Sequence, residues 1–494
     1  MQLASIPNLM PALPEIVLAV ASLALLMLGV FLRGSNIART ISYACIILLI
    51  VTIPVMLIST NEPGSTFGGV FIVNEFTLFI KTFVLLSAAA IILISKDYRE
   101  LQSIDFFEFP LLIVLATLGM MLMVSANDFL GLYLAIELQS LSLYVIAAFQ
   151  RDSARSGEAG LKYFVLGALS SGLMLFGISL IYGFSGSTNF NILSEVFVAL
   201  NNKLPPAGVI VGLVFIVAGF SFKISAVPFH MWTPDVYEGA PTPVTALLSA
   251  APKLAAMGLF VRILVGPFGE LGDQWQQIVI FMSIASMSLG AFAAINQKNI
   301  KRMMAYSSIG HMGYALIGIV AAGAIEDLSS RIYGIQAMLV YLIIYLFMNI
   351  GAFSGILLLK REGRMVENID DLAGLSKTNP GLAMIFSIFM FSMAGIPPLA
   401  GFLGKLYVFQ AAINSELYTL AIIGVIASVV GAFYYIRIVK VIYFDPPIEA
   451  LDVSVSTEIK AVLIITGFVT TFLILYPMPL ISGAEQATAS LFVK

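Results

Sequence analysis

Long apolar runs, separated by short polar stretches, follow one another along the whole chain. A helix of about 20 apolar residues crosses a hydrocarbon layer of about 30 Å, and the runs reach that length. They lack the alternation of apolar and polar positions that marks a membrane β-strand. The pattern predicts an all-α polytopic membrane protein with about fourteen spans, near residues 13–32, 40–59, 74–95, 109–126, 128–149, 161–184, 206–228, 243–266, 275–295, 302–323, 331–359, 380–414, 418–443 and 459–482.

Proline interrupts two of the predicted spans. The seventh breaks at residues 226–228 and resumes towards Tyr237, and the twelfth breaks at residues 395–398 and resumes towards Asn414. Proline removes a backbone donor and clashes with the preceding turn. In hydrocarbon the freed carbonyls must find partners, so broken helices are expected where protein or internal water surrounds them.

A weak internal repeat relates the two breaks. A shift of 170 residues places Pro228 on Pro398 (398 − 228) and Tyr144 on Tyr314 (314 − 144). Each unit then has five spans, an odd number, so consecutive copies insert with opposite orientation, as in many transporters. We expect four regions: an N-terminal three-helix segment at 1–108, a first antiporter-like repeat at 109–266, a second inverted repeat at 267–443 and a C-terminal helix within 444–494.

Charge and metal-binding residues are scarce. Charged residues make up 11% of the chain and hydrophobic residues 60%, which agrees with a membrane protein. Cys45 is the only cysteine, and His230 and His311 are the only histidines. Iron–sulfur clusters and structural zinc sites need more ligands of these types than the chain has. No metal or cofactor is therefore expected within this chain.

Basic residues indicate the orientation of the spans. They concentrate in the segments that follow odd-numbered spans, such as Lys298, Lys301 and Arg302, and few follow even-numbered spans. By the positive-inside rule the odd-numbered segments are cytoplasmic. Both termini then lie on the periplasmic side. The acidic segment 233–242 is a cytoplasmic exception.

Four charged residues are expected deep in the layer. Asp128 is a good helix cap, which places Glu137 about 14 Å into the fifth span at 1.5 Å per residue. Lys223, Lys253 and Lys405 lie within the seventh, eighth and twelfth spans. Glu137 is the only carboxylate expected at this depth.

These groups have the chemistry of a proton relay. Burial favours the neutral forms of lysine and of a carboxylic acid, and a nearby opposite charge favours the charged forms. Such groups exchange protons when a neighbour moves, and water joins them into a relay. His311, with Ser307 and Ser308 on the same span, is expected to hydrate the path between Lys253 and Lys405.

The same residues also have plainer interpretations. Lys223 is then only the structural partner of Glu137, and His311 is a satisfied core residue. His230 and Asp235 form either a proton-collecting rim at the cytoplasmic mouth or a packed and solvated face. Two further cations that lie nearer the ends of their spans, Lys81 and Arg262, are expected to snorkel to the interface.

Three stretches carry a specific resemblance: PFHMWTPDVYEGAPTPVTA at 228–246, MAGIPPLAGFLGKLYVF at 393–409 and NDFLGLYLAIELQSLSLYV at 127–145. They resemble the antiporter-like membrane subunits of proton-pumping NADH–quinone oxidoreductase (respiratory complex I). The resemblance covers essentially the whole chain and is greatest to the group called subunit N or subunit 2. Lys405 stands where sequences of the related subunit M group carry glutamate.

The resemblance implies a function and its site. It implies a proton-translocating subunit of the bacterial inner membrane, driven by electron transfer in other subunits. Glu137 matches the family's key acid, Lys223 its partner lysine, Lys253 the central lysine and Lys405 the exit-side lysine. NADH, FMN, iron–sulfur clusters and quinone are implied in partner subunits. The implied neighbours are small membrane subunits on one flank and subunit M on the other, within the lipid bilayer and without nucleic acid.

Two other functions use the same residues. A cation/proton antiporter subunit of the Mrp type has the same sites with a different driver, and co-purification with flavin and iron–sulfur subunits separates it. A non-pumping structural scaffold uses the lysines to hold lipid or neighbouring subunits, so lysine-to-methionine changes would alter assembly rather than pumping. A membrane enzyme is disfavoured, because no segment concentrates Asp, His or Ser in a catalytic arrangement.

Overall fold

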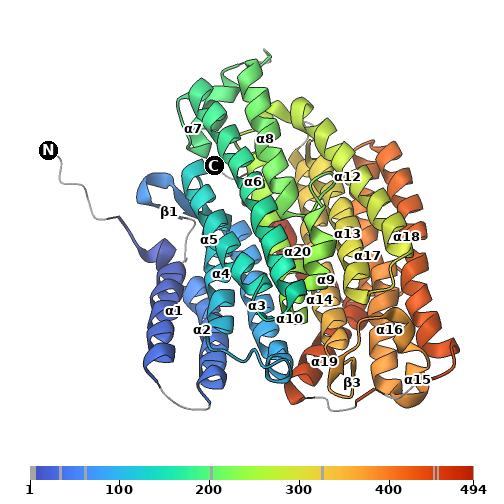
Figure 1. The fold of residues 1–494 in the computed structure, drawn as a ribbon. Coiled ribbons are helices and arrows are strands. Elements are labelled where there is room, and N and C mark those ends of the chain that lie inside the picture. Colours follow the sequence, from blue (N-terminus) through green and yellow to red (C-terminus); the bar gives the residue numbers. More distant parts are fainter. Residues whose placement is uncertain are drawn as a thin grey trace.

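The computed structural model describes residues 7–32, 36–59, 64–200, 204–323, 328–448, 451–452 and 456–492. Its helices run roughly side by side, from the N-terminal ones (blue) at the left of Figure 1 to later ones (orange) at the right, and the last helix (red) lies behind the middle. The α-helices are α1 Leu13–Phe31, α2 Ile37–Ser59, α3 Glu75–Leu101, α4 Glu108–Ser125, α5 Phe129–Ala147, α6 Ala154–Ser185, α7 Phe190–Val198, α8 Ala207–Lys223, α9 Trp232–Gly239, α10 Thr242–Ser249, α11 Ala251–Val265, α12 Gly272–Ile295, α13 Ile300–Gly323, α14 Leu328–Ile356, α15 Leu375–Thr378, α16 Pro380–Ala394, α17 Ala400–Asn414, α18 Tyr418–Phe444, α19 Thr457–Phe472 and α20 Met478–Ala489.

Short elements connect these helices. The 3-10 helices are η1 Met10–Ala12, η2 Phe67–Gly69, η3 Gly269–Leu271, η4 Ile369–Leu372 and η5 Leu473–Leu475. Two antiparallel hairpins pair β1 Gly64–Thr66 with β2 Phe71–Val73 and β3 Lys360–Arg361 with β4 Arg364–Met365. The sequence pattern predicted neither hairpin, because strands of two or three residues leave no periodic signal.

The chain is a multi-pass membrane protein. Twelve helical stretches among the described residues are long and apolar enough to cross a membrane, and α8 and α16 are shorter apolar helices. Most boundaries lie within a few residues of the prediction. α6 begins at Ala154, well before the predicted 161, because Ser153 caps it by accepting a hydrogen bond from the Ser156 amide. Its first two turns are polar, so hydropathy alone hides them.

The most buried helices form the centre of the molecule. In α13 and in α14, 94% of the most apolar segment is buried, and that of the α10–α11 stretch is fully buried. Large apolar side chains are exposed instead on outer helices such as α1, α6 and α18. A polar or charged group on the central helices is therefore surrounded by protein rather than by lipid.

Both predicted helix breaks are present. α16 ends at Ala394 and α17 begins at Ala400, as predicted. The first break starts earlier than expected, because α8 ends at Lys223 and α9 begins at Trp232. The carbonyls freed there are satisfied by protein: the Phe222 carbonyl accepts from Trp232 Nε1 at 3.0 Å. The predicted requirement for internal partners at a break is thus met.

A third break was not predicted. The expected eighth span consists of α10 and α11, which meet at Ala250 with φ −117° and ψ −92°. Pro252 lies in the first turn of α11, where its missing amide proton costs no intrahelical bond. Its place inside an otherwise continuous apolar run made the two helices look like one.

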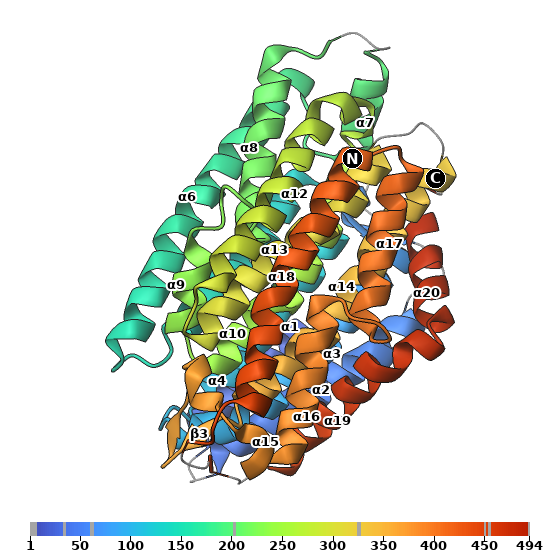
Figure 2. The same ribbon diagram turned by 90° about the vertical axis from the view of Figure 1, so that its right-hand side faces the viewer.

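The C-terminal helices return to the N-terminal ones. α19 ends at Phe472, so the predicted span to 482 is too long, and Pro477 separates it from α20. α20 contacts α3 and α14 (Figure 1), and Figure 2 shows α19 beside the lower part of α16. The prediction for the termini falls on residues 1–6 and 493–494, which lie outside the described residues.

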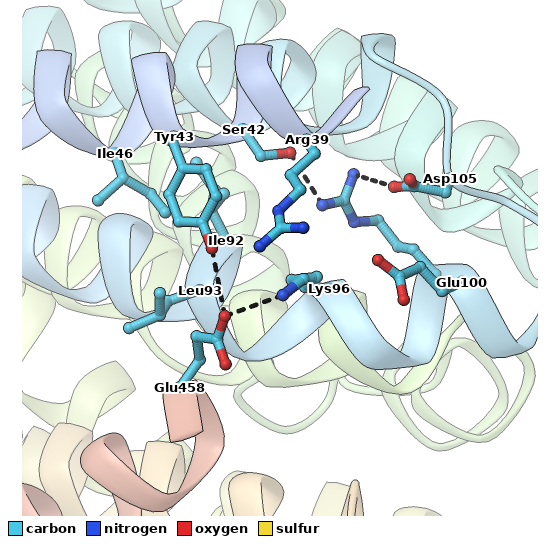
Figure 3. Close-up of a pocket in the computed structure, with 11 residues that line it drawn as sticks. Arg39, Ser42, Tyr43, Ile46, Ile92, Leu93, Lys96, Glu100, Asp105 and Glu458 are labelled. Carbon is cyan, nitrogen blue, oxygen red and sulfur yellow. Dashed lines mark hydrogen bonds and ion pairs between the residues drawn. The ribbon is translucent and has the colours of Figure 1, made fainter. Parts of the chain in front are cut away.

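A polar pocket joins α19 to α2 and α3 (Figure 3). The Glu458 carboxylate accepts hydrogen bonds from Lys96 Nζ at 2.9 Å and from the Tyr43 hydroxyl at 3.2 Å. Buried Arg99 donates to the Ser42 hydroxyl at 2.9 Å and pairs with Asp105, also at 2.9 Å. The contacts of Glu458 with Lys96 and Tyr43 therefore hold α19 against α2 and α3.

Candidate functional site

Glu137 lies on the outer face of α5. Its neighbours one turn away on that face, Leu134 and Leu141, are exposed, and Glu137 itself is half-buried. The Ser171 hydroxyl of α6 donates a hydrogen bond to the Glu137 carboxylate. The Tyr133 hydroxyl lies 3.2 Å from that of Ser171. The acid is thus held by hydroxyls on a surface that is otherwise apolar.

Lys223 bonds a serine on the same helix as this acid. It is the last residue of α8, and its Nζ donates to the Ser140 hydroxyl at 2.6 Å. Ser140 follows Glu137 by one helical turn, so the two share a face of α5. No ion pair within 4.0 Å joins Glu137 to Lys223 among the described residues, although the two charges lie close enough to interact. The Ser140 hydroxyl itself donates to the Ile136 carbonyl at 2.6 Å, so among the described residues the structure shows no direct contact between Glu137 and Lys223.

Lys253 is buried at the centre of the molecule. It is the third residue of α11, directly after the break at Ala250. Its Nζ donates to the Ser308 hydroxyl of α13 at 2.5 Å, and the Tyr345 hydroxyl donates to the same oxygen at 2.8 Å. Its ammonium also stands 5.4 Å from the centre of the Tyr237 ring. Hydroxyl and aromatic groups surround this lysine.

His311 and Ser307 form the next cluster along α13. His311 Nδ1 lies 2.6 Å from the Tyr341 hydroxyl, and Nε2 lies 3.0 Å from the Tyr435 hydroxyl. The Tyr435 hydroxyl is also 2.5 Å from that of Ser307. Both ring nitrogens therefore face a hydroxyl, which can donate or accept a proton.

Lys405 closes the series on α17. Its Nζ donates to the Ala394 carbonyl at 2.9 Å and to the Ser428 hydroxyl at 2.8 Å. A small cavity of about 10 Å³, lined by Lys405, Ser307 and His311, joins it to the histidine cluster. That volume is about what one water molecule needs. The structure thus brings together Lys253, the α13 cluster and Lys405.

Each of these lysines stands at a helix break and bonds a serine. Lys223 ends α8, Lys253 follows the end of α10, and Lys405 binds the last carbonyl of α16. The C-terminal end of a helix carries partial negative charge, which favours a cation. Helix C-terminal ends at Lys223 and Lys405, and serine hydroxyls at all three lysines, thus stand where a carboxylate would otherwise pair with a lysine.

Aromatic rings fill the space between Lys223 and Lys253. Lys223 Nζ lies 5.9 Å from the centre of the Tyr144 ring, which is 4.7 Å from that of Tyr163. Tyr163 stacks on Trp232 at 4.5 Å, and Trp232 lies 6.3 Å from the Tyr237 ring under Lys253. Aromatic rings rather than hydroxyls therefore link these two lysines.

The predicted rim residues lie apart from this series. Asp235 pairs with Lys162 at 2.6 Å and with Arg302 at 2.8 Å. Burial raises the pKa of Asp235, but the hydrogen bonds from these two cations outweigh it and hold the pKa below its ordinary value. Burial lowers the pKa of half-buried His230. The structure shows a paired ionic network at Asp235 rather than free acids.

Lys81 and Arg262 do not snorkel, contrary to the prediction. Lys81 is 1% exposed and pairs at 2.6 Å with Glu15, which is 3% exposed. Arg262 is buried and donates to the Val124 carbonyl at 2.6 Å, at the end of α4. Glu15, in the first turn of α1, is a buried carboxylate that the sequence pattern did not indicate.

Several hydroxyl partners were missed by sequence reasoning. Ser140 lies three residues after Glu137, and the sequence alone places the two on one face of a helix. Tyr341 and Tyr345 share a face of α14 at a spacing of four, which was also visible. Ser428 and Tyr435 are brought in only by the packing of α18. No group of three or more His, Cys, Asp or Glu among the described residues has the arrangement of a metal site.

Known proteins are similar over nearly the whole chain. A family model described as "NADH:quinone oxidoreductase/Mrp antiporter, TM" matches residues 126–431. A protein of Paramagnetospirillum magneticum named NADH-quinone oxidoreductase subunit N is 54% identical, with 98% of each chain covered.

Solved structures share the fold. A chain of respiratory complex I from Thermus thermophilus with bound aureothin has a TM-score of 0.80 at 28% identity and covers 95% of this chain and 98% of its own length. A chain of the Mrp complex from Dietzia sp. has a TM-score of 0.80 at 21% identity, covering 97% and 98%. That second likeness is one of fold alone.

Proposed function

The chain belongs to the NADH:quinone oxidoreductase/Mrp antiporter membrane family as a proton-translocating membrane subunit of an NADH–quinone oxidoreductase, and from this premise we propose that its protons move along Glu137, Lys223, Lys253 and Lys405. The observation that carries the proposal is the contact series at the centre. Lys253 bonds Ser308, and His311 and Lys405 line one cavity. Lys253, His311 and Lys405, on three separate helices, are thus close enough for single water molecules to bridge them.

The proposed cycle begins with Lys223 and Lys253 loaded from the cytoplasmic side. A change at Glu137, imposed by the neighbouring subunit, alters the balance between charged and neutral Lys223. When Lys223 becomes charged, it repels the proton on Lys253. That proton then passes through Ser308 and the His311 cluster to Lys405. Lys405 then releases the proton to the periplasmic side.

The energies involved are modest. Moving one charge against 100 mV costs about 2.3 kcal/mol. Hydrogen bonds to charged groups contribute about 1.5–3 kcal/mol each. Making or breaking one such contact, as between Lys223 and Ser140, is therefore comparable to the work of moving a proton.

We propose that the two breaks mark inverted five-span repeats and that α8 and α16 complete a set of fourteen spans. Lys223 lies 5.9 Å from the Tyr144 ring and Lys405 lies 5.1 Å from the Tyr314 ring. These tyrosines are the pair that the 170-residue shift superimposes. The proposed regions remain 1–108, 109–266, 267–443 and 444–494.

We propose a bacterial inner-membrane location with both termini periplasmic. The basic ends of α3, α6 and α13 face the same side as the β3–β4 hairpin, which the positive-inside rule makes cytoplasmic. Other complex I subunits are the expected partners, with small membrane subunits against the α5 face and subunit M on the other flank. These partners would supply the NADH, FMN, iron–sulfur and quinone chemistry.

The test is a double variant, Glu137→Gln with Lys223→Met, in the assembled complex reconstituted into vesicles. We expect NADH oxidation and assembly to persist while the protons moved per NADH fall. Lys440→Met is the matched control, since Lys440 is exposed and pairs only with Asp445 among the described residues. Wild-type proton movement in a well-assembled double variant would reject the relay.

The same experiment addresses the two other functions. A structural scaffold predicts loss of assembly with normal pumping in whatever complex remains. An Mrp-type antiporter predicts that sodium gradients, rather than NADH oxidation, drive proton movement through this chain.

A further inference from the structure

A large cavity lies where α3 and α5 end and α4 begins, apart from the proposed relay. It has a volume of about 620 Å³ and is bordered by α1, α4, the end of α5 and the segments that connect α3 to α4 and α5 to α6. That volume is in the range of about 300–1,000 Å³ found for sites that hold small molecules. Glu137, Lys223, Lys253 and Lys405 do not line it.

The inner wall of this cavity is apolar. Leu111 and Leu115 of α4 line it together with Val145 of α5 and Leu26 of α1. Leu115 follows Glu108 at the start of α4 by seven residues (115 − 108), so this wall is about 10 Å long at 1.5 Å per residue. Val145 and Leu26 are both exposed. An apolar surface therefore runs from the start of α4 into the depth of the membrane, with room for an apolar chain.

The outer rim of the cavity carries charges of both signs. Arg151 and Asp152 follow α5, and Glu108 is the first residue of α4. All three side chains are exposed, and none of them forms an ion pair with another described residue. The neighbouring Gln102 and Gln150 side chains, by contrast, hydrogen-bond each other at 3.3 Å. The three charged groups therefore remain available to a ligand.

The rim lies at the surface of the membrane, because its charges stand at the ends of helices long and apolar enough to cross it. A phospholipid has the same order of parts, with a charged headgroup at the surface and apolar chains in the hydrocarbon layer. The change from a charged rim to an apolar wall therefore matches a phospholipid better than a soluble ligand or a wholly apolar one.

The charges of the rim select among headgroups. Purely anionic headgroups are held by clusters of Lys and Arg, whereas this rim has one cation and two carboxylates. The Arg151 guanidinium suits a phosphate, which it can bind through two parallel N–H···O bonds. The carboxylates of Glu108 and Asp152 suit a primary ammonium, which donates up to three hydrogen bonds. An ethanolamine phospholipid carries both of these groups.

We propose that this cavity binds one ethanolamine phospholipid, with its phosphate at Arg151, its ammonium at Glu108 and Asp152, and one acyl chain along Leu115 and Val145. The site goes beyond the proposed relay and takes no part in proton transfer. The lipid fills the space beside the exposed face of α5, where a neighbouring membrane subunit is expected.

The position of Val145 supports a lipid that the assembled complex retains. Val145 follows Leu141 by one helical turn, and Leu141 follows Glu137 by another, so the three lie along one face of α5. Leu141 and Val145 are both exposed. A small membrane subunit is proposed to pack against this face, so the lipid is enclosed between two subunits and exchanges slowly.

The first test uses photoactivatable phospholipids in vesicles that contain the assembled complex. Two probes have the same acyl chains, with the photoreactive group on one chain, and differ only in an ethanolamine or a glycerol headgroup. Mass spectrometry identifies the cross-linked peptides of α1 and α4. An ion pair at an exposed position contributes up to about 1 kcal/mol, which is about fivefold in binding. We therefore expect up to about fivefold more cross-linking with the ethanolamine probe.

Charge variants separate the two ends of the headgroup. Glu108→Gln with Asp152→Asn should abolish the preference for the ethanolamine probe. Arg151→Gln should lower labelling by both probes, because both carry the phosphate. The matched control is Arg364→Gln, which removes an exposed arginine of β4 at the same end of the molecule but outside this cavity.

A second measurement counts the phospholipid that purifies with the complex. Leu26→Trp places a larger side chain at the cavity from an exposed position of α1, so the variant keeps the core intact. Val20→Trp is the control, at another exposed position of α1 that does not line the cavity. We expect the Leu26→Trp complex to lose one tightly held ethanolamine phospholipid and the Val20→Trp complex to keep it.

Two results would overturn the proposal. Equal labelling by the two probes, with no effect of the charge variants, would mean that the cavity holds an ordinary boundary lipid without selection. No labelling of α1 or α4, together with an unchanged lipid content in Leu26→Trp, would mean that a segment of another subunit fills the cavity. Neither result bears on the relay, because neither measures proton movement.

Discussion

At the scale of single residues, buried and partly buried cations in this protein are stabilised in two different ways. Lys223, Lys253 and Lys405 bond serine hydroxyls, which satisfy either charge state of the amine. Lys81 instead faces the Glu15 carboxylate at 2.6 Å, which favours only the charged form. The first kind of site suits a group that gains and loses a proton, and the second suits a fixed structural pair.

The Glu15–Lys81 pair gives a prediction about stability. Glu15→Gln leaves a buried lysine without a counter-charge, which in proteins costs about 3–5 kcal/mol. The double variant Glu15→Leu with Lys81→Met removes both charges and should recover most of that loss. The measurement is the thermal unfolding of the purified complex, with Glu270→Gln on an exposed position as the control.

Pumping per assembled complex should stay normal in that double variant, because the pair lies outside the relay. If Glu15→Gln is as stable as the wild type, or if Glu15→Leu with Lys81→Met loses pumping, the pair is not a fixed structural ion pair.

At the scale of elements, helix breaks position the lysines of the proposed relay. The two breaks that contain proline within an apolar run, at residues 226–228 and 395–398, were predicted from the sequence. The break at Ala250 was not predicted, because Pro252 sits at the first turn of α11, where proline is tolerated. Glu137, Lys223, Lys253 and Lys405 were identifiable because charges in apolar runs are rare. Their serine and tyrosine partners were not, because hydroxyls are common in such runs.

Gly395 tests the role of the second break. It has φ +86°, and an added Cβ would lie 2.8 Å from Lys405 Cδ. Gly395→Ala therefore strains the backbone by about 1–2 kcal/mol and displaces Lys405 from Ala394. We expect fewer protons per NADH with assembly largely retained.

Gly381→Ala is the control for that variant, since no atom lies within 4 Å of an added Cβ there. Normal proton movement in Gly395→Ala would mean that the position of Lys405 at the break is not important.

At the scale of the whole molecule, ionic contacts hold distant parts of the chain together at one end. Asp235 of α9 binds Lys162 of α6 and Arg302 of α13, and Glu367 binds Lys301. Glu458 of α19 binds Lys96 of α3 (Figure 3). No sequence pattern predicted these pairings, because each joins segments that meet only after folding.

This ionic end gives a prediction about pH. The pKa values of Asp235 and Glu367 lie below their ordinary 3.8 and 4.5. Their contribution to stability is therefore complete above those ordinary values and is lost as the pH falls through the lowered ones. We expect the unfolding temperature to be nearly constant from pH 7 to about pH 5 and to fall below about pH 4.

Asp235→Asn should reduce that acid-dependent loss, and high salt should weaken the partly exposed pairs. Asp273→Asn, an exposed position of α12, is the control. An unchanged acid profile in Asp235→Asn would contradict the assigned role of this network.

The central claim is that Lys253 and Lys405 are joined through the α13 cluster by polar atoms and water. A density map of the assembled complex at a resolution that shows ordered water tests it most directly. We expect an unbroken series from Lys253 through Ser308 and His311 to Lys405, with neighbours within about 3.2 Å of each other. A dry gap in that series, wider than one water molecule bridges, would contradict it.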